Sequence, residues 1–370
     1  MNKTKERIVG LDLFRILSMC GIIGLHIMGN GGVLANTNMY TSTYPFLILI
    51  YCLFYLSVNS FGVLSGYLGI EKRKNNYARL LELIAVILFF IVTETAVFYI
   101  FNINNVRAAG LKTLAKALFP FGVGYYWYIT CYIFLFFLMP YINCFVKNLS
   151  QKTYKKLLVV LFALLAIVPN IFLQTDFFRN DNGYTALQLI FCYLIGGYFR
   201  LYPATISKSK IALRFGITIA SMTIFNYLWR IATMKFFGHT IRDSWMINYI
   251  SPLNIYASCL LLQFFSQARI KNKAIAKVLI LLGSSAFSVY IFHDHYLFFN
   301  FVLKDIFALF AIKNAVLVIP MIFVAIVAIY LVGLVSDMIR RGGFKLLRLD
   351  NLLAVAGDKL NKKMDIKDEK

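Results

Sequence analysis

Ten apolar windows, each about 18–25 residues long, limit the architectures open to this chain. A window of that length matches the roughly 20 residues that an α-helix needs to cross about 30 Å of hydrocarbon. The windows lie near 8–28, 45–70, 79–101, 126–146, 156–174, 184–201, 211–230, 249–268, 278–301 and 314–338. The sequence therefore predicts an all-α fold, a polytopic membrane helix bundle of about ten transmembrane helices.

Composition excludes a soluble domain. Of the 370 residues, 60% are hydrophobic and 15% are charged, whereas soluble domains carry about 25% charged residues. The first window contains Asp12 and Arg15 and has no small-residue cleavage site, so we expect it to be retained as a helix rather than removed as a signal peptide.

The basic residues predict the orientation of the bundle. The formal net charge is +22, and 28 of the 38 lysines and arginines fall in the loops and tails on one side of a ten-helix topology. Short basic loops mark the cytoplasmic side of a membrane protein. We therefore expect both termini to be cytoplasmic, with the lipid bilayer and not nucleic acid as the partner of the positive charge.

The chain changes character after Gly343. The segment "FKLLRLDNLLAVAGDKLNKK" has leucines at helical spacing and several lysines, a pattern typical of a helix that lies along a membrane surface. The sequence thus predicts a transmembrane domain over 1–343, followed over 344–370 by an amphipathic interfacial helix and a charged cytoplasmic tail.

Charged groups inside the first window are the strongest functional signal. An ionisable side chain within a span costs about 2.5–3.5 kcal/mol on insertion scales, so it is a candidate for function. Arg15 and His26 are eleven residues apart, about three helical turns, which places them on one face roughly 16 Å apart. Asp12 precedes Arg15 by three residues, the spacing of an ion pair on that face. The alternative is that Asp12 and Arg15 snorkel at one interface and His26 lies at the other.

Two further groups are ionisable. Glu94 lies well inside the third window, where a carboxyl group needs a partner, and a structural role is as open as a catalytic one. The ninth window contains "HDH", with His293, Asp294 and His295 in its outer half. Adjacent helical residues point about 100° apart, which is poor geometry for chelation. We therefore expect no metal.

At this point the sequence resembles the acyltransferase-3 integral membrane O-acyltransferases. That family carries R-x-x-x-L-D-x-x-R followed by ten residues and a histidine in its first helix, and here Arg7, Leu11, Asp12, Arg15 and His26 fill every position.

Later segments extend the resemblance over most of the chain. The matching segments are "FGVLSGYL" in the second window, "WYITCYIFLFFLMPYIN" in the fourth, which begins with Trp127 and Tyr128, and "SSAFSVYIFH" in the ninth, which ends at His293. Two features depart from the family. The family often carries an R-x-x-R at the start of the third helix, and here only Arg79 holds a matching place, with Lys72, Arg73 and Lys74 upstream. Some relatives also carry a fused C-terminal hydrolase-like domain, and we expect none here.

The resemblance implies transfer of an acyl group, usually acetyl, from acyl-coenzyme A (acetyl-CoA) to a hydroxyl of a cell-envelope glycan or similar acceptor, by a multi-pass protein of the cell membrane. The site residues would then divide by role. In catalysis, His26 would be the base, Arg15 with Asp12 would hold donor charge or stabilise the oxyanion, and Glu94 would assist. The donor would be bound by Arg7, Arg73 and Arg79. The acceptor would be bound by Trp127, Tyr128 and His293.

Two other functions remain open at this stage. Intramembrane charges also occur in transporters and flippases for glycans or lipid-linked substrates, although no inverted repeat is visible here. A non-catalytic scaffold is the third possibility. The acceptor, the acyl chain length, a homo-oligomer and glycan-assembly partners are likewise undetermined by the sequence.

Overall fold

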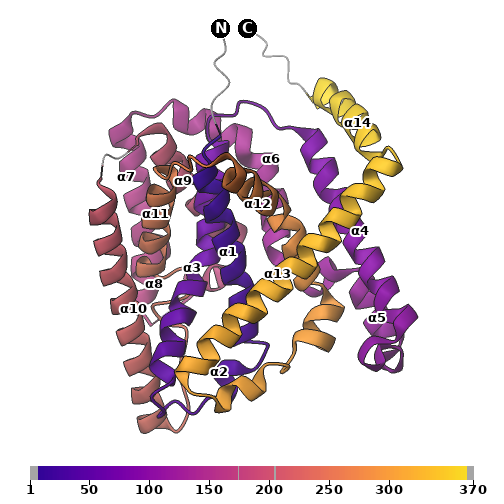
Figure 1. Ribbon diagram of the computed structural model, residues 1–370. Helices are drawn as coiled ribbons and strands as arrows, with labels where there is room; N and C mark the ends of the chain where they lie inside the picture. The colour runs from indigo at the N-terminus through magenta and orange to yellow at the C-terminus, as the bar shows by residue number, and fades with distance from the viewer. Residues whose placement is uncertain (1–6, 174, 204–205, 365–370) are drawn as a thin grey trace.

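The computed structural model describes residues 7–173, 175–203 and 206–364, and this part of the chain contains helices and no strand. Figure 1 shows a bundle whose first helix, α1 (Val9–Met28), runs through the centre. The other long helices are α3 (Tyr44–Gly69), α4 (Tyr77–Phe101), α6 (Trp127–Lys147), α10 (Lys208–Phe237), α12 (Lys273–His293) and α13 (Ala315–Leu346). Shorter helices are α2 (Val33–Asn36), α5 (Gly110–Leu118), α7 (Gln151–Phe162), α8 (Val168–Ile171), α9 (Ala186–Leu201), α11 (Pro252–Ser266) and α14 (Leu349–Met364).

The expected class of fold is confirmed. Within the described residues, eight helical segments are long and apolar enough to cross a membrane, so the protein is a multi-pass membrane protein. The predicted windows 184–201 and 249–268 form shorter apolar helices, α9 and α11, of 16 and 15 residues. At about 1.5 Å per residue, each is shorter than the hydrocarbon layer is thick.

Side-chain caps explain where several helices begin. Asn76 accepts hydrogen bonds from two backbone N–H groups in the first turn of α4, and Ser251 accepts one in the first turn of α11. Asn272 and Asn314 do the same for α12 and α13. Such residues satisfy N–H groups that have no partner inside the helix.

Helix α1 is the core element of the bundle. It packs against α3, α11, α12 and α13, and thirteen of its residues, including Asp12, are buried. A charged stripe on this helix therefore faces other helices and not lipid.

One end of the bundle gathers the basic segments. The start of α1, the loop 70–76 and helix α14 lie at the same end in Figure 1, and we call this the basic end. The predicted topology also places four terminal lysines on the cytoplasmic side. They lie outside the described residues and are Lys3, Lys5, Lys367 and Lys370.

The C-terminal segment lies on the start of α4. Helix α13 continues through Gly342 and Gly343 to Leu346, and α14 follows after a short turn. The side chain of Asn361 accepts a hydrogen bond from the backbone N–H of Tyr77 at 2.9 Å. A Cβ on Gly357 would lie 2.3 Å from Ala78. Helix α14 is thus packed tightly beside the start of the fourth helix, at the basic end.

Candidate functional site

A cavity of about 790 Å³ runs along one face of α1. Arg15, Met19, Ile22 and His26 line it from this helix, at spacings of four, three and four residues. Those intervals keep side chains on one helical face. Helices α3, α4, α6 and α12 and several loop residues supply the other walls, so the cavity is enclosed by segments from most of the chain.

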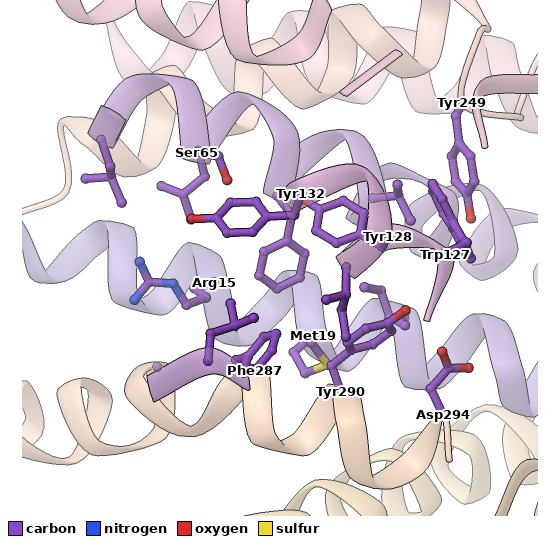
Figure 2. A pocket seen from close by; sticks show the side chains of 18 of the residues that line it. Arg15, Met19, Ser65, Trp127, Tyr128, Tyr132, Tyr249, Phe287, Tyr290 and Asp294 are labelled. Carbon is purple, nitrogen blue, oxygen red and sulfur yellow. The ribbon is translucent and has the colours of Figure 1, made fainter. Parts of the chain in front are cut away.

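The two ends of the cavity differ in chemistry. Arg15, Lys72 and Arg79 line its wall towards the basic end. Figure 2 shows Arg15 at one end and Trp127, Tyr249 and Asp294 at the other. The cavity therefore connects a cationic region with an aromatic region that also holds a carboxylate.

Asp12 fixes the cationic residues of α1. Arg7 donates to both of its carboxylate oxygens, at 2.8 and 2.7 Å, and Arg15 donates to one of them at 3.2 Å. The hydrogen bond to Asp12 raises the pKa of Arg7. The predicted Asp12–Arg15 pair is present, and the carboxylate is shared with Arg7. Two arginines around one buried carboxylate leave a net positive charge, and Arg15 is the one that lines the cavity.

Lys72 and Arg79 add positive charge at the basic end. Burial, together with the nearby charge of Arg79, lowers the pKa of Lys72. A bound anion would stabilise both charges, because each then gains an opposite charge nearby. Arg73 is exposed and does not line the cavity.

His26 lies near the aromatic end of the cavity. Its ring is 5.1 Å, centroid to centroid, from both His293 and Phe299. Its Nδ1 is buried and has no hydrogen-bond partner among the described residues. The imidazole is thus held by ring contacts on one side and borders the cavity on the other.

Aromatic side chains from distant segments meet beyond His26. Trp127, at the start of α6, stacks on Tyr249 with ring centroids 6.1 Å apart and contacts Tyr184 at 4.8 Å. All three line the cavity, as does Tyr128. Tyr184 and Tyr249 lie in the loops just before α9 and α11. Each stands at the first position of a predicted apolar window, and nothing in the sequence indicated that the two would meet Trp127.

The H-D-H segment places its middle residue in the cavity. Asp294 lines the wall, whereas His293 is fully buried and its Nδ1 lies 2.7 Å from the Val289 carbonyl oxygen. We expected His293 to bind the acceptor, but it does not line the cavity, and Asp294, for which we expected no role, does. Spacing offered a signal, since Phe287, Tyr290 and Asp294 recur at three and four residues and all line the cavity.

Glu94 lies elsewhere. Its carboxyl group borders a second cavity, between α4 and α13, and the nearest nitrogen of a histidine is Nδ1 of His295 at 3.6 Å. The described residues contain no group of three or more His, Cys, Asp or Glu side chains that could hold a metal ion.

Comparison with known proteins gives one match, to a family model. The acyltransferase-3 family model, described as an acyltransferase domain, matches residues 8–335. No curated protein and no solved structure matches the chain.

Proposed function

The chain belongs to the acyltransferase-3 family and is an acyltransferase, and on this basis we propose that it moves an acyl group, acetyl in the simplest case, from acyl-coenzyme A to a hydroxyl of a cell-envelope glycan or related acceptor. The observation that carries this proposal is the single cavity that joins the cationic residues Arg15, Lys72 and Arg79 to His26 and to the aromatic cluster, which we define as Trp127, Tyr128, Tyr184 and Tyr249. A cationic end suits the phosphates of a cytoplasmic donor, and aromatic rings suit a sugar. A donor from the cytoplasm and an acceptor from the envelope meet at the cell membrane, where we place the protein.

The distance between Arg15 and His26 along α1 indicates that the two residues have different roles. Eleven residues separate them, about 16 Å along the helix axis, and Arg15 is held by Asp12, which lies one turn further from His26. In this arrangement the two side chains do not contact one reacting carbonyl. Of the two roles considered for Arg15, holding donor charge is the one compatible with His26 as base. The long pantetheine arm of coenzyme A would then extend along the cavity and bring the thioester to His26.

The reaction follows from that placement. The imidazole of His26 takes the proton of the acceptor hydroxyl as the oxygen attacks the thioester carbonyl carbon. The tetrahedral intermediate then breaks its C–S bond, and the sulfur takes the proton from the imidazolium to leave as coenzyme A thiol. Atoms and charge balance without a metal or redox partner.

The neighbouring residues have supporting roles in this proposal. Trp127 and Tyr128 bind the acceptor, and Asp294 takes the place at the cavity that we expected of His293. His293 instead packs on His26 and positions its ring. Glu94 lies outside this cavity, so we assign it no part in the transfer.

The direct test is transfer of a labelled acetyl group. The purified protein in nanodiscs is mixed with [¹⁴C]acetyl-coenzyme A and a panel of hydroxyl-bearing glycans, and label in the glycan is measured. We expect label to reach a glycan with release of one thiol per acetyl group. Transfer to amines alone, or thiol release without any acylated acceptor across the panel, would contradict the proposal.

Charge at the basic end should govern the affinity for the donor. Arg79→Gln and Lys72→Gln each remove one charged contact to a phosphate, a change of roughly 1.5–3 kcal/mol or about tenfold or more in binding. We expect KM for acetyl-coenzyme A to rise by at least about tenfold while kcat changes little. Arg214→Gln, an exposed residue of α10 away from the cavity, is the matched control. If KM rises equally in the control, or does not rise in either Arg79→Gln or Lys72→Gln, the two residues do not bind the donor.

A further inference from the structure

A second cavity of about 430 Å³ lies between α4, α13 and the segment Phe298–Leu303. Its lining is aromatic and aliphatic, with Phe90, Phe98, Phe292 and Phe298 among its walls. Among the described residues, none that lines this cavity also lines the first one. It is therefore a separate site, and we call it the lateral pocket.

The lateral pocket opens towards the bilayer. Val97 of α4 and Ile339 of α13 lie on its rim and are 45% and 67% exposed. Both belong to helices that are long and apolar enough to cross a membrane, and Figure 1 shows α13 crossing the bundle towards α4. Exposed apolar side chains within such helices face lipid tails. Molecules dissolved in the bilayer thus have access to the pocket.

The pocket contains a carboxyl group without a hydrogen-bond partner. Glu94 is 7% exposed, and neither of its oxygens has a hydrogen bond within the described residues. Its neighbour His295 does not supply one, since the separation of 3.6 Å is too long and the same Nδ1 accepts from the backbone N–H of Leu297 at 3.3 Å. A nitrogen that accepts a hydrogen bond has no proton to donate.

An unsatisfied carboxyl group in an apolar site is costly, because it loses its hydrogen bonds to water and gains none. The fold retains Glu94 at this position, so a ligand that donates a hydrogen bond would remove the cost. In hydrocarbon, a neutral donor is favoured over an ammonium group, because bringing a charge into a span carries its own penalty. A hydroxyl group meets this requirement, and the phenylalanines around it accommodate an alkyl or isoprenoid chain.

We propose that the lateral pocket binds a long-chain alcohol from the bilayer, with its hydroxyl donating a hydrogen bond to Glu94 and its chain packed among Phe90, Phe98 and Phe298. The proposal rests on the Glu94 environment and on the position of the pocket, and it does not depend on the proposed function. It also explains why a carboxylate that sequence analysis assigned to catalysis lies outside the acyl-transfer cavity.

The test uses a photoreactive long-chain alcohol that carries a diazirine on its chain. The full-length protein in nanodiscs is irradiated with this probe, and the labelled peptides are identified by mass spectrometry. We expect labelling to concentrate on α4 and on residues 298–303. An unlabelled alcohol of the same length should compete, whereas the alkane and the primary amine of that length should compete at least about tenfold less well.

Two variants and one control distinguish recognition of the hydroxyl group from occupation of the pocket by any apolar chain. Glu94→Leu removes the acceptor oxygens without creating a new unsatisfied group, and it should lower labelling by about tenfold. Val97→Trp narrows the opening of the lateral pocket and should lower labelling as well. Glu82→Leu, which removes an exposed carboxylate from the same helix, should leave labelling unchanged.

Several results would overturn the proposal. One is labelling spread evenly over the lipid-facing helices. Another is equal competition by the alkane or better competition by the amine. Labelling that falls in Val97→Trp but persists in Glu94→Leu would show an apolar groove that does not recognise the hydroxyl, and this too would refute the assignment.

Discussion

Replacing His26 by alanine should lower acyl transfer by about 10²–10⁴-fold, the usual contribution of a general base. The imidazole borders the cavity and contacts the rings of His293 and Phe299, so its removal takes away the proton acceptor together with two ring contacts. Transfer of [¹⁴C]acetyl and thiol release are measured together, and the fold is checked by size-exclusion chromatography.

Two additional measurements make the His26 result specific. His239→Ala, in an exposed loop after α10, should retain full activity. Added imidazole should restore part of the activity of His26→Ala, because the cavity of about 790 Å³ can admit a small base beside the substrates. Full activity in His26→Ala would exclude His26 as the base, and a loss of activity that imidazole does not rescue would point to a structural role.

Replacing Gly196 by alanine should abolish the folded bundle or lower its thermal midpoint more than any other single methyl addition in this region. Helices α3 and α9 touch backbone to backbone at two glycines. A Cβ on Gly196 would lie 1.8 Å from the Val63 carbonyl oxygen, and one on Gly66 would lie 1.9 Å from the Tyr193 carbonyl oxygen. Backbone atoms cannot rotate away as a side chain can, so the helices must separate, at a cost above the roughly 1–3 kcal/mol of ordinary overpacking.

The control variant, Gly216→Ala, should raise the thermal midpoint of the protein, whereas Gly196→Ala should lower it. A Cβ added to Gly216, in α10, would meet open space, with no neighbouring atom of the described chain within 4 Å. Alanine in place of glycine within a helix stabilises by up to about 1 kcal/mol. Thermal midpoints from fluorescence-detected size-exclusion chromatography would compare the two variants. A Gly196→Ala protein with an unchanged midpoint and a single symmetric peak would contradict the close packing of α3 and α9.

The first helix shows how far a local pattern can predict a site. The spacing of Arg15 and His26 placed them on one face of a helix, and the structure brings that face onto a single cavity. A period of about 3.6 residues is a property of the helix itself and needs no knowledge of its neighbours. The Asp12–Arg15 pair was predictable on the same ground, because both residues lie within one turn.

Residues that meet across elements were harder to predict. Trp127, Tyr184 and Tyr249 come from a helix start and two loops, and their contacts depend on how loops close over the bundle. In the H-D-H segment, the sequence restricted the number of residues that can face one cavity but did not select Asp294 over His293. That selection depends on the rotation of α12 against α1, which is set by packing.

The order of residues along the chain was enough to predict a helical membrane bundle, the charged face of its first helix and the membership of an acyltransferase family, because hydrophobic length, helical period and motif spacing are all local properties. Three outcomes required the packed structure: Lys72 and not Arg73 borders the cavity, Asp294 lies beside the aromatic cluster, and Glu94 belongs to a different pocket. These outcomes depend on the rotation and depth of helices packed against one another, and such packing is set by contacts between residues far apart in the chain.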